Sequence, residues 1–326
     1  MKRASGGISV DRYSVVLIAV AAILWASDAL FRNNLIGHLS ASQIVVAEDG
    51  LITLFLVPVL VRSVGELSGL SWRGWVAVLL IAGGAQALAT LLFTQSFSYR
   101  IYAETFVLQQ TQPLIALVLA WVVLGERRRP WFWATVAVAL VGVYMVVFAY
   151  NPTDPLSALQ HGRLEAGLFA LGAAVLWAAG TVLGRYALGS LSFWAVTSMR
   201  FTLALPVLVV VVLVQYGLGG FGHYRVSDFV PNLLAIALVP GLLALLLYYR
   251  ALSRTPASLS TIAELALPVT ATFIAAYQFH QPVYPAQIVG TALLVAVIIL
   301  LNVTKDRAAE APAPAALKLA QTAEKA

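Results

Sequence analysis

Ionisable side chains lie inside several long apolar stretches of this 326-residue chain. A charged group within a lipid bilayer is costly, so it normally faces a cavity, a ligand or an oppositely charged partner. The chemistry open to such groups is the binding of a substrate charge or of a proton. The candidates are Asp28, Glu48, Asp49, Arg200, Arg250 and Glu264, with Glu104 near the end of another apolar stretch.

Asp28 shares one helical face with Trp25 and Arg32, because residues three and four apart are neighbours on a helix. We expect Trp25 and Asp28 to line a central cavity, where Asp28 could bind a cationic substrate or a proton. The alternative is an Asp28–Arg32 ion pair at the membrane surface, since Asp28 lies close to the end of its apolar stretch.

Glu48 and Asp49 are consecutive, so they point about 100° apart on an α-helix of 3.6 residues per turn. We expect one to line the cavity and the other to pair with a neighbour. Glu48 is the predicted cavity residue, because its counterpart in a second sequence repeat is Arg200 and equivalent repeat positions face the same pseudo-axis. The alternative is a structural ion pair between helices.

Arg200 and Glu264 are placed by the sequence about two turns from the same membrane surface. They are either the charges of a gate or substrate site, or a permanent buried pair, which is costly to break from one side.

Amides and tryptophans add candidate substrate contacts. Gln109 and Gln112 belong to a stretch too polar for a lipid-facing surface, and Pro113 frees a carbonyl that polar side chains or water can satisfy. Trp25 and its repeat counterpart Trp177 offer aromatic faces for an apolar group or an ammonium ion.

Composition places the chain among integral membrane proteins. Hydrophobic residues make up 61% and charged residues 10%, against about 25% charged in soluble domains. The net charge is +6, but the basic residues lie in short gaps between apolar runs, which is typical of membrane topology rather than nucleic-acid binding. Without cysteine, clustered histidines, a nucleotide-binding loop or a nucleophile–base pair, we expect no metal, no cofactor and no enzyme activity.

Ten apolar runs are long enough to span a bilayer as helices. They cover about 13–31, 41–61, 73–97, 101–124, 131–150, 166–186, 192–215, 229–251, 257–279 and 283–303. The sequence also repeats itself: AAILWASDALFR at 21–32 returns as AAVLWAAGTVLGR at 173–185. The fold class is therefore an all-α membrane protein built from two five-helix repeats.

The distribution of Lys and Arg predicts the orientation. With a cytoplasmic N-terminus, the inner segments hold fourteen basic residues and the outer loops hold four, namely Arg32, Arg100, Arg163 and Arg225. This bias places both termini in the cytoplasm. Because five is odd, the second repeat enters the membrane inverted, as in secondary transporters that work by alternating access.

The chain resembles the EamA-type members of the drug/metabolite transporter superfamily. The resemblance rests on the two repeats, on Leu-Trp-Ala in the first and sixth helices, and on Pro113 with Leu124-Gly125-Glu126 in the fourth. It covers roughly residues 13–303 and implies a first EamA-type repeat at 13–150 and a second at 164–304, joined by an outer linker at 151–163. The basic-residue bias makes the N-terminus at 1–12 cytoplasmic, and the Ala-, Pro-, Glu- and Lys-rich composition of 305–326 predicts a disordered cytoplasmic tail. The resemblance also implies export of amino acids or other small metabolites across a bacterial inner membrane.

We therefore expect a secondary transporter, an exporter of small metabolites such as amino acids, with protons as a candidate coupling ion and lipid as its surroundings. The acids on one side of the cavity and Arg200 on the other suit a zwitterion. The alternatives are an uptake carrier for choline-like amines and a non-transporting scaffold. The expected substrate or coupling residues are Trp25, Asp28, Glu48, Gln109, Gln112, Trp177, Arg200 and Glu264.

Overall fold

The computed structural model describes residues 12–124, 130–154, 162–222, 226–252 and 263–303. Within these ranges the chain is almost entirely helical and forms no strand beyond an isolated bridge between Ile36 and Leu39. The all-helical prediction is confirmed. The predicted N-terminal segment up to residue 11, the tail from 305 and most of the linker lie outside the described residues.

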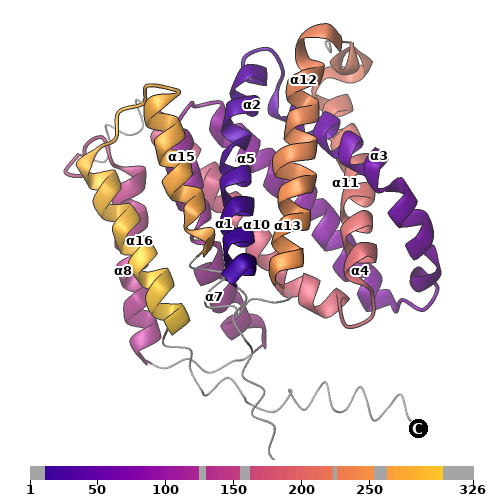
Figure 1. The fold of residues 1–326 in the computed structure, drawn as a ribbon, viewed down its shortest axis with the longest axis horizontal. Helices are drawn as coiled ribbons and strands as arrows, with labels where there is room; N and C mark the ends of the chain where they lie inside the picture. The colour runs from indigo at the N-terminus through magenta and orange to yellow at the C-terminus, as the bar shows by residue number, and fades with distance from the viewer. Residues whose placement is uncertain (1–11, 125–129, 155–161, 223–225, 253–262, 304–326) are drawn as a thin grey trace, which may run out of the picture.

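The first half of the chain forms a bundle of interrupted helices (Figure 1). They are α1 (Arg12–Ala26), α2 (Asp28–Leu35), α3 (Ala41–Leu67), α4 (Trp72–Leu80), η1 (Ile81–Leu88), α5 (Ala89–Phe97), α6 (Tyr102–Gln109), α7 (Gln112–Leu124) and α8 (Pro130–Val147).

The second half repeats this pattern. Its helices are α10 (Arg163–Ala187), α11 (Phe193–Tyr216), η2 (Gly217–Phe221), α12 (Val226–Ile236), η3 (Ala237–Leu243), α13 (Ala244–Leu252), α15 (Ala266–Tyr277) and α16 (Pro285–Val303).

Helices lie in all ten predicted ranges, and among the described residues six of the resulting rods are long and apolar enough to cross a membrane. These six are Tyr13–Leu35, Ala41–Leu67, Trp72–Phe97, Arg163–Gly184, Phe193–Phe221 and Phe229–Tyr248. The shorter apolar helices are Trp131–Val147, Ala266–Tyr277 and Pro285–Leu300. The count of ten spans stays a prediction. One boundary was wrong: Arg32, assigned to an outer loop, lies within α2, because α2 continues the first helix to Leu35.

Matching positions of the two halves use the same local chemistry. Ser40 and Ser192 each begin a helix by accepting a hydrogen bond from a backbone N–H three residues on, which satisfies a donor that the helix leaves unpaired. The η1 and η3 segments are both π-helical, and π-turns are often found at functional sites.

Proline interrupts the fourth predicted helix between α6 and α7. Pro113 cannot donate a hydrogen bond, and the helix breaks at Gln110 and Thr111. The Thr111 hydroxyl donates to the Leu108 carbonyl at 2.7 Å, so a side chain satisfies a carbonyl at the break. In the second half, α15 likewise begins two residues before Pro268.

Helices from the two halves pack in reciprocal pairs. α3 packs on α11, and α8 packs on α16. α1 of the first half packs on α13 and α15 of the second half. In the same way, α10 of the second half packs on α5 and on the α6–α7 pair of the first half. α3 and α11 are antiparallel, since the Ser42 hydroxyl bonds Gln215 at 2.6 Å and the Ser192 hydroxyl bonds Glu66 at 2.8 Å.

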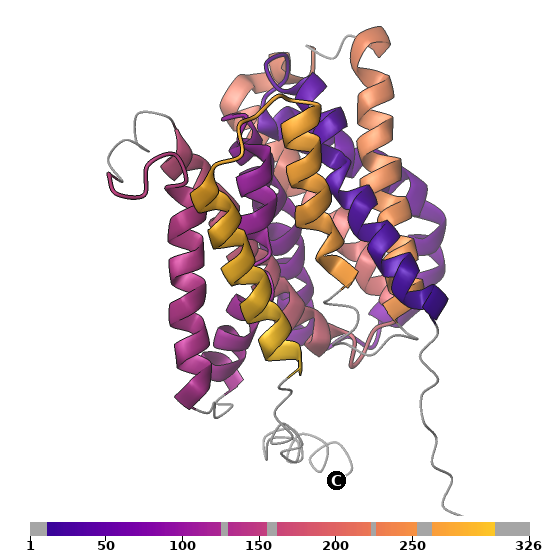
Figure 2. The same cartoon turned by 60° about the vertical axis from the view of Figure 1, so that its left-hand side comes forward.

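The start of α1 and the end of α16 lie at the same end of the bundle, and α2 lies at the other (Figures 1 and 2). We call the latter the α2 end. This arrangement is the one expected when an even number of spans separates the two termini.

Glycines allow α8 and α16 to touch through their backbones. A Cβ atom on Gly290 would lie 2.7 Å from the Gly142 carbonyl oxygen, and one on Gly142 would lie 3.0 Å from the Gly290 carbonyl oxygen. Small residues of this kind let membrane helices approach closely.

We predict that Gly290→Ala destabilises the protein by about 1–3 kcal/mol, because the added methyl group cannot fit without moving a backbone. The measurement is thermal unfolding of the purified protein in detergent. Gly65→Ala is the control, since a Cβ atom there meets nothing within 4 Å. Equal melting of Gly290→Ala and the wild type would contradict the close contact.

Candidate substrate and coupling site

Arg32 is the centre of a buried polar network at the α2 end. Its Nε and Nη2 atoms donate to the two carboxylate oxygens of Asp28 at 2.6 and 2.8 Å. Nη2 also donates to Glu48 Oε2 at 2.9 Å, and Nη1 donates to the Thr94 hydroxyl at 2.8 Å. The network joins α2, α3 and α5, and the exposed fraction of Arg32 is 2%.

The network brings together two of the predicted cavity residues, Asp28 and Glu48. Both are buried, and both are held by the same guanidinium group. The Asp28–Arg32 pair weighed in the sequence analysis is present, but it is buried rather than at the surface. The bidentate pair with Asp28 lies within α2 and orients the guanidinium, and the bond from Arg32 to Glu48 joins α2 to α3.

Asp49 lies apart from the Arg32 network and is fully buried. Its Oδ1 accepts a hydrogen bond from Gln86 Nε2 at 2.9 Å, and Gln86 belongs to the π-helical η1. Consecutive acidic residues therefore have different partners, as the helical geometry predicts.

Trp25 forms an aromatic and polar group with two residues of the second half. The Trp25 ring lies 5.0 Å from that of Tyr248, and the Tyr248 hydroxyl donates to Glu264 Oε1 at 2.6 Å. The Gln110 amide approaches the Glu264 backbone carbonyl at 3.5 Å. Trp25, Tyr248 and Glu264 are all partly exposed, unlike Asp28 and Glu48.

Trp177 forms a matching group with residues of the first half. Its ring lies 5.3 Å from that of Phe93, and its backbone carbonyl accepts from the Thr181 hydroxyl at 3.0 Å. Gln112 Nε2 donates to the same Thr181 hydroxyl at 3.3 Å. Nearby in sequence, Gln109 is partly buried and its Oε1 has no hydrogen-bond partner among the described residues.

Both tryptophans border one hydrophobic cluster, which contains Phe93, Phe97 and Phe106. Each tryptophan therefore combines an aromatic face with a neighbouring amide, hydroxyl or carboxylate group. Such a combination can stack on a flat ring and hydrogen-bond to its edges.

Arg200 lies on α11, is partly buried, and has its guanidinium carbon 5.5 Å from the Phe201 ring. It acts electrostatically on Asp49. Glu264 was a candidate partner for Arg200, but in the structure Glu264 accepts a hydrogen bond from Tyr248. Arg200 lies within electrostatic range of Asp49 instead. The gate role of both residues stays a prediction.

Contacts between the two halves hold the α2 end together. Asn34 on α2 bonds Asn232 on α12 at 3.1 Å, and the Tyr102 ring lies 4.6 Å from that of Phe279. These contacts hold the two halves together at the α2 end, and the Arg32 network adds contacts among helices of the first half.

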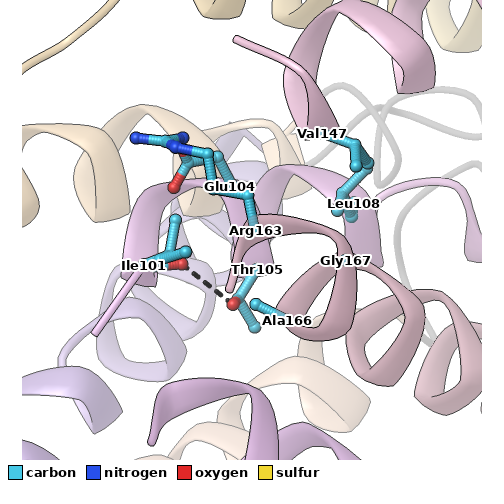
Figure 3. A pocket seen from close by; sticks show the side chains of 8 residues that line it. All are labelled: Ile101, Glu104, Thr105, Leu108, Val147, Arg163, Ala166 and Gly167. Carbon is cyan, nitrogen blue, oxygen red and sulfur yellow. Dashed lines mark hydrogen bonds and ion pairs between the residues drawn. The ribbon is translucent and has the colours of Figure 1, made fainter. Parts of the chain in front are cut away.

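A small pocket lies between α6, α8 and α10, away from the tryptophans (Figure 3). At its edge Arg163 forms a salt bridge with the buried Glu104, and the Arg163 guanidinium lies 4.8 Å from the Tyr284 ring. The two oppositely charged residues of this pocket are therefore paired with each other.

The spacing of four between Asp28 and Arg32 predicted their pairing, but not the bonds from Arg32 to Glu48 and Thr94. The role of Thr181 was also missed, although its spacing of four from Trp177 gave a local signal. The contacts of Arg32 with Glu48 and Thr94 join helices distant in sequence, for which the chain carries no local signal.

Comparison with known proteins supports the repeat and the fold. The EamA-like transporter family model matches residues 12–148 and again residues 165–303. The riboflavin transporter ImpX of Fusobacterium nucleatum subsp. nucleatum is 26% identical over 88% of this chain and 96% of its own length. The uncharacterized transporter YwfM of Bacillus subtilis is 25% identical over 76% of this chain and 80% of its own. A crystal structure that is 20% identical superposes with a TM-score of 0.55 over 90% of this chain and 97% of that chain, which shows a shared fold.

We predict that Arg32→Gln costs about 3–5 kcal/mol of stability, because it leaves two buried carboxylates without their cation. The measurement is chemical or thermal unfolding in detergent. The triple variant Arg32→Gln, Asp28→Asn, Glu48→Gln should recover a large part of the loss. A triple variant no more stable than Arg32→Gln would mean that the charges are not what the arginine stabilises.

Proposed function

The chain belongs to the EamA-like transporter family, and from this premise we propose that it is a secondary carrier of a planar, hydrogen-bonding aromatic metabolite such as riboflavin. The family makes the chain a multi-pass membrane transporter of a small molecule rather than an enzyme. The substrate class, the mechanism and the direction are the proposed part.

The observation that carries the substrate class is the pair of aromatic groups built around Trp25 and Trp177. Each tryptophan is partly exposed and packs against a second ring, Tyr248 for Trp25 and Phe93 for Trp177. Polar groups lie one contact further away: the Tyr248 hydroxyl donates to Glu264, and the Thr181 hydroxyl donates to the Trp177 backbone carbonyl. A flat heteroaromatic ring offers π-faces to the tryptophans and hydrogen-bonding edges to those groups. The name of the relative ImpX, a riboflavin transporter, points to the same substrate chemistry.

The reciprocal packing of the two halves supports ten membrane spans arranged as inverted repeats. Such repeats place the substrate between them and transport it by alternating access. Trp25 and Trp177 occupy matching repeat positions and border one cluster, as a site on the pseudo-axis requires. In the orientation that the basic residues predict, the closed α2 end faces outward and both termini lie in the cytoplasm of a bacterial cell.

An amino acid or an amine is a second candidate substrate. The observation that favours it is the Glu264 carboxylate beside the Trp25–Tyr248 pair, an arrangement that can bind an ammonium group. Arg200 would then bind the carboxylate of an amino acid. Binding of the ammonium by Asp28 or Glu48 has less support, since both carboxylates already accept hydrogen bonds from Arg32. Export is the direction that the family resemblance implies.

We predict that the purified protein in liposomes exchanges labelled riboflavin across the membrane, and that Trp25→Ala and Trp177→Ala each weaken apparent affinity. The expected loss is about 1–3 kcal/mol per lost stacking ring, or roughly 5- to 150-fold. The control is Trp72→Ala, because Trp72 is 71% exposed at the start of α4 and remote from both groups.

Riboflavin exchange that is unaffected by both site variants, or absent in the wild type, would contradict the aromatic site. A pool of labelled amino acids and choline-like amines, run in the same liposomes, then tests the second candidate. Uptake from that pool that is lost in Glu264→Gln would identify an ammonium substrate, and additional dependence on Arg200 would identify an amino acid.

A further inference from the structure

The ionisable groups around Asp49 carry unequal numbers of negative and positive charges. The carboxylates of Asp28, Glu48 and Asp49 lie near the guanidinium groups of Arg32 and Arg200, so with every group ionised one negative charge is in excess. The other described elements beside Asp49, η1, η3 and α5, contain no ionisable residue. α12 also contacts α3 and carries Asp228 in its first turn.

Asp49 is the carboxylate that lacks a direct ionic contact. Asp28 and Glu48 each accept hydrogen bonds from Arg32, whereas Asp49 accepts only from the neutral Gln86 amide. Its second oxygen, Oδ2, is buried without a hydrogen-bond partner among the described residues. A buried charge with an unsatisfied oxygen is costly, and a proton on Oδ2 removes both the charge and the imbalance.

We propose that the Asp49 carboxyl group is the proton-binding site through which this carrier couples to a proton gradient. The inference rests on the proposed function as a secondary carrier, and it transfers the coupling role from Glu48 to its neighbour. One proton binds Asp49 Oδ2 from one side of the membrane and leaves to the other side, with no other bond made or broken.

The surroundings of Asp49 offer a route for that proton. Thr53 lies four residues further along the same face of α3, and its hydroxyl is buried without a partner among the described residues. The Thr202 hydroxyl on α11 is also buried without a hydrogen-bond partner among the described residues. Because α3 and α11 are antiparallel and Gly50 lies opposite Leu205, Thr53 and Thr202 lie at about the same level. Unsatisfied polar groups are what an internal water needs for binding.

Asp49 is also placed where its charge can affect the shape of a helix. Gln86, its hydrogen-bond donor, lies in the π-helical η1 between α4 and α5. Protonation of Asp49 weakens the charge-assisted hydrogen bond that it accepts from Gln86, so it changes the contact between α3 and η1. Single π-helical turns inside α-helices are often found at functional sites.

The test compares exchange with gradient-driven accumulation in proteoliposomes. We expect Asp49→Asn to exchange labelled substrate as the wild type does, and to lose accumulation to the level seen without a proton gradient. The matched control is Glu66→Gln, which removes an exposed carboxylate from the same helix and should retain accumulation. Asp49→Glu, which keeps the carboxyl group, should retain at least part of it.

A wild type that exchanges no labelled substrate would refute the proposed substrate, not the proton site. Accumulation by Asp49→Asn at the wild-type level would overturn the proton site.

A direct measurement covers the case in which Asp49→Asn does not fold. Infrared difference spectra of the wild type between acidic and alkaline buffer should show a protonated-carboxyl band that shifts when aspartate is isotopically labelled. In Asp49→Glu the band should become insensitive to that label. Absence of the band in the wild type, or a label-sensitive band that persists in Asp49→Glu, would also overturn the proposal.

Discussion

The structure depends on the pairing of buried charged side chains with one another in the interior, where water is scarce. Arg32 places one guanidinium between two carboxylates and a hydroxyl, and in doing so it joins three helices at the α2 end. An isolated buried charge would be destabilising, whereas the network satisfies both acids with one cation.

The proposed substrate site and the proposed proton site involve different residues. The tryptophan groups combine residues of both halves: Trp25 contacts Tyr248, and Trp177 contacts Phe93. Asp49 instead lies on α3, which packs on α11, and accepts a hydrogen bond from Gln86 of η1. Gln86 and Phe93 lie on one continuous rod, Trp72–Phe97, so this rod connects the two proposed sites.

Hydropathy and the repeat were sufficient to predict the helical fold, because a bilayer forces each apolar run of sufficient length to form a helix. The family match confirms the transporter class. The break at Ser27 and the π-turns were not predictable, since they depend on neighbours rather than on composition. For the site, spacing placed Trp25, Asp28 and Arg32 on one face. It could not decide between Glu48 and Asp49, because that choice depends on which helix presents Arg32 and which presents Gln86.

The two halves are alike in shape but not in charge. The repeat positions that match Asp28 and Arg32 are Gly180 and Gly184, and a Cβ atom on Gly180 would lie 2.3 Å from that of Ala85. One end of the bundle thus closes through ions, while the equivalent place in the other half uses close backbone contact. In the proposed alternating-access cycle, a state held by buried ion pairs and a state held by close packing would differ in their dependence on temperature. The resting population of the proposed carrier would then depend on its surroundings as well as on its substrate.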